Sequence, residues 1–159
     1  MSGLLALLQE FYRDKLAMLL RHQTAAKAIT DYNVNNTYQY VINREETQLS
    51  WIAAAITDLG GSLPDASPAP REGGGKGAAQ RLIEEDARDV QAFVDRWKPR
   101  VDAMPNARHA KMLRLVLGEA LEARRFFEQA LAGRDDLLGR RADSLGPAFG
   151  DVLPTRWIE

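Results

Sequence analysis

Polar side chains able to bind metal or hydrogen-bond interrupt the apolar stripes of several helical segments in this 159-residue chain. Within the segment 34–59, inward positions recur alternately three and four residues apart, which keeps them on one side of a helix. Glu45 lies in this stripe, whose other members are Tyr38, Ile42, Leu49, Ile52, Ile56 and Leu59. An isolated charge in a protein core costs several kcal/mol. Glu45 therefore needs a metal ion, a cation or a hydrogen-bond network.

Polar residues of the first helical segment are expected at the level of Glu45. His22 and Gln23 lie about ten residues before the first expected turn, and Glu45 lies a similar distance after it, so at about 1.5 Å per residue they are level to within a helical turn. Gln48 follows Glu45 by three residues and shares its face. The sequence thus predicts a polar group where the first two helices meet.

The second half of the chain repeats this arrangement. Asp89 lies about fifteen residues before the second expected turn and Glu119 about fourteen after it, again level to within about a turn. Asp86 lies on the apolar stripe of the third segment, and Glu122 follows Glu119 on the same face. Every segment is therefore expected to offer a polar group to one middle layer.

Four helices must position these groups, at about 3–29, 35–59, 78–103 and 107–132. The first stripe is expected to be Leu5, Leu8, Tyr12, Leu16, Leu19, Gln23 and Ala26, the third Leu82, Asp86, Val90, Phe93, Trp97 and Val101, and the fourth His109, Leu113, Val116, Ala120, Phe127 and Ala130. Pro99 is expected to kink or end the third helix, and Gly133 to follow the fourth. Turns at about 30–36 and 104–106 make two antiparallel hairpins.

A stretch rich in glycine, proline, serine and alanine covers about 60–77 and is expected to be one long connection. Connections of this length are uncommon in compact domains, and this one is long enough to cross a whole bundle. We therefore expect a four-helix bundle over 1–132. The tail, 133–159, is expected to pack on the bundle through Trp157 and Ile158.

The composition is ordinary for a globular protein, with 45% hydrophobic and 27% charged residues and a net charge of −1. This charge does not favour binding to nucleic acid or an anionic membrane. Cysteine is absent, which excludes disulfides and thiol chemistry. The first residues lack the basic start and cleavage site of a secretion signal, and their apolar run is too short to span a bilayer. We therefore expect a cytoplasmic protein.

The two hairpins, the long crossover and the run from Tyr40 to Trp51, followed by Leu59-Gly60-Gly61, resemble the ferritin-like superfamily in its rubrerythrin and bacterial ferritin-like branches. The resemblance implies an all-α, ferritin-like four-helix bundle in which two glutamates and two Glu-x-x-His motifs hold a di-iron or di-manganese centre. It also implies redox or oxidase chemistry with oxygen or peroxide, and pairing of two chains as a homodimer.

Carried onto this sequence, the resemblance implies a metal site built from Glu45, Gln48, Glu119, Glu122, Asp86, Asp89 and His22. The chain departs from the motif because Gln48 and Glu122 stand where the two histidines would be. Glutamine is a poor iron ligand, whereas carboxylates and imidazole suit iron or manganese.

The alternative is a metal-free helical module that binds a partner or self-associates. Glu45 and Gln48 would then form a hydrogen-bonded core pair, with Arg44 or His22 as the partner of Glu45. Replacing Glu45 by leucine should in that case be neutral or stabilising, because exchanging a buried polar group for a packed apolar one often is.

Overall fold

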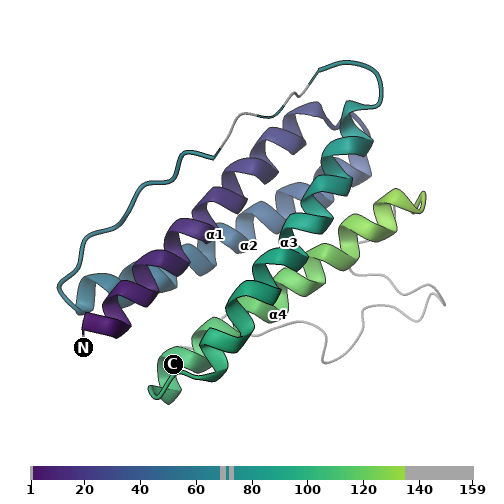
Figure 1. Cartoon of the computed structure of the whole chain (residues 1–159). Coiled ribbons are helices and arrows are strands. Elements are labelled where there is room, and N and C mark those ends of the chain that lie inside the picture. The colour runs from purple at the N-terminus through teal and green to yellow at the C-terminus, as the bar shows by residue number, and fades with distance from the viewer. Residues whose placement is uncertain (1, 69–70, 72–73, 135–159) are drawn as a thin grey trace. The chain divides into compact units, whose positions relative to one another are not determined.

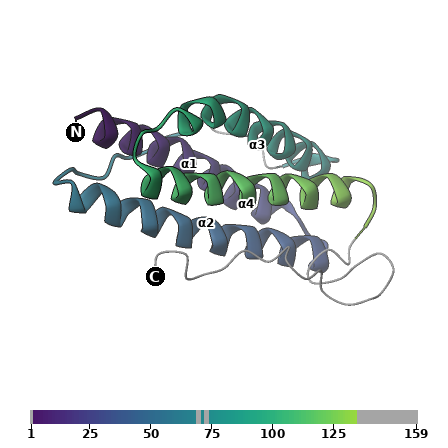
Figure 2. The same ribbon diagram turned by 90° about the horizontal axis from the view of Figure 1, so that it is seen from below.

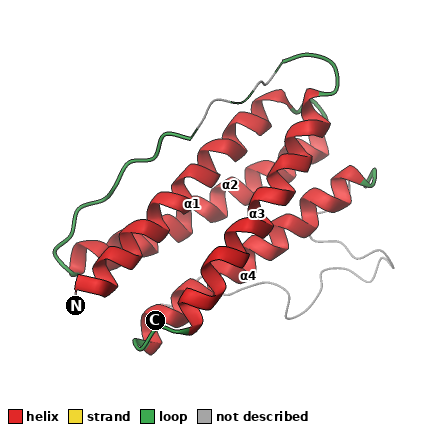
Figure 3. Cartoon of the chain, in the orientation of Figure 1, coloured by secondary structure: helices red, strands yellow, loops and turns green. Residues whose placement is uncertain are grey.

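The computed structural model describes residues 2–68, 71 and 74–134. Within these ranges the chain forms four α-helices and no strand (Figure 3). The helices are α1 (Ser2–Ala28), α2 (Tyr32–Asp58), α3 (Ala78–Asp102) and α4 (Ala107–Leu131). The all-α prediction is confirmed, and every helix bound lies within three residues of the one expected. Of the tail, 133–159, the structure describes only positions 133 and 134. The predicted packing through Trp157 and Ile158 therefore lies outside the described residues.

The chain divides into two compact units, Met1–Leu82 and Ile83–Glu159. The first unit holds α1, α2, the crossover and the first turn of α3, and the second holds the rest of α3 together with α4. Whether the four helices form a single bundle over 1–132 depends on how these two units pack, so the single bundle stays a prediction.

In the first unit α1 and α2 form an antiparallel hairpin with a short turn (Figure 1). Asp31 is the N-cap of α2, and its carboxylate accepts a hydrogen bond of 2.9 Å from the backbone N–H of Val34. The Asn35 side chain donates to the carbonyls of Ala26 and Ile29, at 2.8 and 3.2 Å, and so satisfies the end of α1. Because of this capping, α2 begins at Tyr32, three residues earlier than predicted.

The crossover leaves α2 through Gly60, whose φ of +80° favours glycine. It then runs beside α1, as Figure 1 shows. The Gln9 side chain donates to the Ser62 carbonyl at 2.9 Å, and Arg71 donates to the carbonyl of Arg21. These two attachments lie twelve residues apart on α1, about 18 Å at 1.5 Å per residue. The predicted long connection is confirmed for the described part of 60–77.

The buried face of α1 differs from the predicted one. Its core positions, again three and four residues apart, are Leu8, Phe11, Lys15, Met18, His22 and Ala25, with Leu19 and Ala26 beside them and Ile29 just beyond the helix. Leu5, Tyr12, Leu16 and Gln23 of the predicted stripe are only half-buried. The prediction for α1 was wrong in rotation because it passed over Lys15, a charged residue, when it followed the apolar side chains.

The stripes of α2 and α3 agree closely with prediction. From Tyr38 to Ile56 every predicted α2 position is buried, with Glu45 3% exposed, and Leu59 is half-buried. In α3 all predicted positions from Leu82 to Val101 are buried, including Asp86 at 0%. Their apolar residues are frequent enough to fix the rotation of each helix without help from the polar ones.

In the second unit α3 and α4 form an antiparallel hairpin (Figure 2). Arg124 donates a hydrogen bond to the side-chain oxygen of Gln91. Near the turn, Arg114 Nε lies 3.3 Å from Asp102 Oδ1. The α3 helix continues through Pro99 for three residues, so the expected early end was wrong, and the alternative, a kink at Pro99, stays a prediction. A proline removes one N–H bond but does not end a helix that packing holds in place.

Asn106 caps α4 by accepting from the backbone N–H of His109 at 3.0 Å, and Gly133 follows the helix with a φ of +89°. Leu113, Val116, Ala120 and Phe127 are buried as predicted. His109 and Ala130 are half-buried.

None of the described helices combines the length and the apolar character that a membrane span requires.

Candidate functional site

A buried polar cluster joins α1 to α2 in the first unit. The Glu45 carboxylate lies between two α1 side chains, with Oε2 3.4 Å from Lys15 Nζ and Oε1 2.7 Å from His22 Nδ1. Exposed fractions are 1% for Lys15, 1% for His22 and 3% for Glu45. We call these three residues the buried cluster.

Helix geometry places the two α1 members on one side of Glu45. Lys15 and His22 are seven residues apart, close to two helical turns, so they share the face that α1 turns toward α2. The short hairpin turn brings Glu45 opposite the stretch between them. Lysine reaches the carboxylate because its stem is long enough to pack in the core while its ammonium meets the charge.

The charge state of Glu45 follows from its surroundings. Burial by itself raises the pKa of Glu45, but the nearby His22 and Lys15 act in the opposite direction by charge and by hydrogen bonding. The net result is a pKa of Glu45 below its ordinary value. An ionised carboxylate only accepts hydrogen bonds, so Lys15 Nζ and His22 Nδ1 are both donors here.

Other polar and aromatic groups lie close by on α2. The rings of His22 and Tyr38 meet edge to face, with centroids 6.1 Å apart and planes at 84°. Gln48 is 1% exposed, and its Oε1 finds no hydrogen-bond donor in the part of the chain that is described. Such an acceptor in a core costs about 1–3 kcal/mol. Arg44, one predicted partner of Glu45, instead lies over the Trp51 ring at 5.8 Å.

The residues predicted for a metal site fall into two groups. His22, Glu45 and Gln48 are buried in the first unit, and the predicted contact between His22 and Glu45 is observed. In the second unit Asp86 is fully buried, whereas Asp89, Glu119 and Glu122 are half-buried. Across residues 2–68, 71 and 74–134, no three histidine, aspartate or glutamate side chains form a group suited to a metal ion.

The donors of the buried cluster are a poor fit to a dinuclear iron or manganese centre. The cluster offers one carboxylate and one imidazole, and Gln48 adds only an amide. Its third member, Lys15, is a cation within 3.4 Å of the carboxylate that a metal would use. A second positive charge there would compete with the ammonium for the same oxygens. The metal site implied by the resemblance stays a prediction.

Sequence reasoning missed Lys15. The signal was present, because Lys15 completes the three- and four-residue spacing of Leu8, Phe11, Met18 and His22. A lysine at such a position, opposite a buried glutamate on the next helix, indicates an internal ion pair.

Comparison with known proteins adds no further identification. No protein-family model, no curated protein and no solved structure matches this chain.

Proposed function

We propose that this chain is a ferritin-like helical module that functions by self-association and whose buried cluster needs no metal. The observation that carries the proposal is the double commitment of the Glu45 carboxylate to Lys15 and His22. The ammonium supplies the positive charge that a metal would otherwise supply. With exposures of 3% or less, the cluster is closed to any substrate, so function belongs to the outer surface.

The first half of α2 offers a surface suited to a second copy of the chain. The twelve residues 32–43 contain no charged side chain. Tyr32, Asn36, Gln39 and Asn43 recur four, three and four residues apart, so they form one exposed stripe along the helix. Tyr32 is 77% exposed. We call these four residues the α2 stripe.

Symmetry favours a second copy as the occupant. In a two-fold dimer each residue near the axis meets itself or a neighbour from the same patch, so a charge there repels its own copy. Amide side chains both donate and accept hydrogen bonds and therefore pair with their like. Interfaces are also enriched in tyrosine and depleted in charge at their centres. The α2 stripe has this composition.

Sedimentation equilibrium of the full chain over a range of concentrations tests the proposal. We expect a reversible dimer, and we expect Gln39→Lys to weaken it at least tenfold by placing like charges near the axis. Gln80→Lys is the matched control, because it makes the same change at an exposed position of another helix, α3, outside the α2 stripe. A monomer at all concentrations, or equal effects of the two variants, would refute self-association through α2.

Metal analysis tests the other part of the proposal. After anaerobic loading with iron or manganese and desalting, we expect less than one metal per chain. The centre implied by the family resemblance would hold about two, and that result, if abolished by Glu45→Ala, would replace the metal-free proposal.

A further inference from the structure

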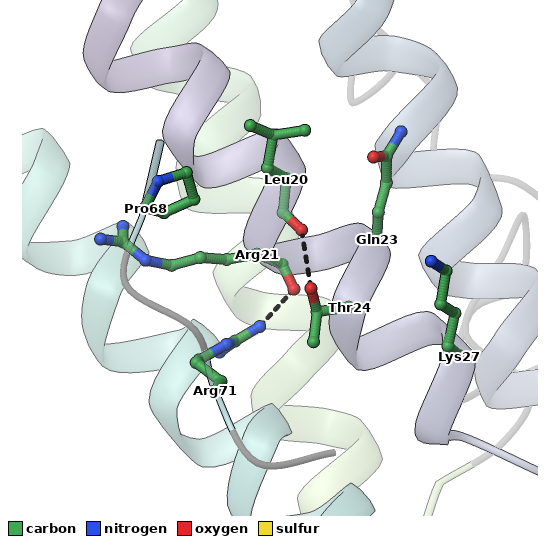
Figure 4. Close-up of a pocket in the computed structure, with 7 residues that line it drawn as sticks. All are labelled: Leu20, Arg21, Gln23, Thr24, Lys27, Pro68 and Arg71. Atoms are coloured by element: carbon green, nitrogen blue, oxygen red, sulfur yellow. Dashed lines mark hydrogen bonds between the residues drawn. The ribbon is translucent and has the colours of Figure 1, made fainter. Parts of the chain in front are cut away.

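A cationic hollow lies between the last turns of α1 and the crossover, apart from the buried cluster and the α2 stripe. Its volume is about 250 Å³. Five α1 residues and two crossover residues line it, as Figure 4 shows: Leu20, Arg21, Gln23, Thr24, Lys27, Pro68 and Arg71.

Among the described residues, the charges that line the hollow are all of one sign. Arg21, Lys27 and Arg71 contribute three cations, and none of these lining residues is an aspartate or glutamate. The whole chain has 21 basic and 22 acidic residues, so this grouping does not reflect a basic composition. Like charges around one cavity repel, and an anion among them removes that repulsion.

The geometry fixes one of these cations. Arg71 donates to the backbone carbonyl of Arg21, which holds its guanidinium against the wall of the hollow. Thr24 donates to the Leu20 carbonyl at 3.1 Å, and this leaves its oxygen facing the same region. A cation held in place before a ligand arrives loses less conformational entropy on binding.

Helix stability explains only one of the three cations that line the hollow. Basic residues in the last turn of a helix interact favourably with its dipole, which accounts for Lys27 near the end of α1. Arg21 lies almost two turns before that end, and Arg71 comes from a different segment. Both also line the hollow, and the helix dipole does not account for their place there.

Size and donor geometry define the ligand class. Pockets for drug-sized ligands span about 300–1,000 Å³, so a hollow of about 250 Å³ suits a smaller molecule than a nucleotide. Guanidinium groups match the oxygens of phosphate in a two-pronged geometry, and lysine adds a point charge. We propose that the hollow binds a phosphate group, as inorganic phosphate or a small phosphomonoester, and thereby ties the crossover to α1.

Calorimetric titration of the full chain with inorganic phosphate, at constant ionic strength set by sodium chloride, tests the proposal. We expect saturable binding with one site per chain. Losing one charge-assisted hydrogen bond should weaken it at least about tenfold, so Arg21→Gln and Lys27→Gln should each show that loss. Arg13→Gln, an exposed α1 arginine outside the hollow, is the matched control and should bind as the unmodified chain does.

Two further arms separate the outcomes. Circular dichroism of each variant establishes that it is folded, and Arg71→Lys, which keeps the charge, should retain weakened binding. An absence of saturable binding, or equal loss in Arg13→Gln, would overturn the proposal. Binding of succinate but not phosphate would overturn the assignment to a phosphate group.

Discussion

Replacing Lys15 by methionine removes the ammonium of the buried cluster and keeps most of the side chain's length. Lys15 Nζ lies 3.4 Å from Glu45 Oε2, and the two side chains are 1% and 3% exposed. Breaking a buried ion pair by removing one partner costs about 3–5 kcal/mol, because the remaining charge stays in the core. Domains are stable by only about 5–15 kcal/mol, so we expect a severe loss of stability.

An exposed pair provides the matched control. Lys98 lies 2.8 Å from Asp102, closer than Lys15 lies to Glu45, but these side chains are 66% and 45% exposed. Solvent screens such an exposed pair, so it contributes little to stability. We therefore expect Lys98→Met to have almost no effect, although its ion pair is the shorter one.

Urea unfolding followed by circular dichroism measures the free energy of unfolding of each variant. The structure changes the expectation for Glu45→Leu, which alone would leave the Lys15 ammonium in the core and should now be destabilising. The double variant Lys15→Met with Glu45→Leu removes both charges and should recover most of the loss. A loss below about 1 kcal/mol for Lys15→Met, or one equal to that of Lys98→Met, would refute the ion-pair assignment.

Three further outcomes follow from the described residues. Because the folded-state pKa of Glu45 is lowered, ionised Glu45 should contribute its full stabilisation above the ordinary glutamate pKa of about 4.3. That stabilisation should be lost as the pH falls through the folded-state pKa. The free energy of unfolding of Glu45→Gln should therefore depend less steeply on pH in the acid range than that of the unmodified chain. Gln48→Met should raise the free energy of unfolding by on the order of 1 kcal/mol, because it removes a buried acceptor that has no donor among the described residues, and a loss would contradict this. Gly118→Ala, in open space within α4, should stabilise the fold by about 0.5–1 kcal/mol, whereas Gly133→Ala, at a φ of +89°, should destabilise it by about 1 kcal/mol. Chemical denaturation would measure both changes in the free energy of unfolding. Changes of the same sign for the two variants would contradict the backbone argument.

The sequence was most informative where apolar residues carried the pattern. In α2 and α3 the spacing of large apolar side chains predicts Glu45 and Asp86 as core residues, and both are buried. In α1 leucines are so frequent that several rotations look equally apolar. The observed rotation differs from the predicted one by burying Phe11, Lys15, Met18, His22 and Ala25. A hydrophobicity criterion discards a lysine, so it fails where a lysine is buried by pairing.

The number of residues between each polar side chain and the hairpin turn predicts the contact of His22 with Glu45. The rest of the predicted middle layer of polar groups stays a prediction. A short turn fixes the axial register of a hairpin, and the observed 2.7 Å contact of His22 with Glu45 agrees with that reasoning. Axial level says nothing about rotation. Glu119 illustrates this, because the prediction for it rests on its height along α4, and its side chain is half-buried. Glu122, predicted from the face it shares with Glu119, is half-buried too.

The cations of α1 serve two separate purposes, and this separation can be measured. Consecutive helical residues point about 100° apart, so Arg21 borders the hollow while His22 enters the buried cluster. The described contacts of the buried cluster and the lining of the hollow have no residue in common, and we expect effects at sites without a shared partner to add. Arg21→Gln should therefore leave the coupling energy between Lys15 and Glu45 unchanged while it weakens phosphate binding. A changed coupling energy would mean that the two sites on α1 act as one.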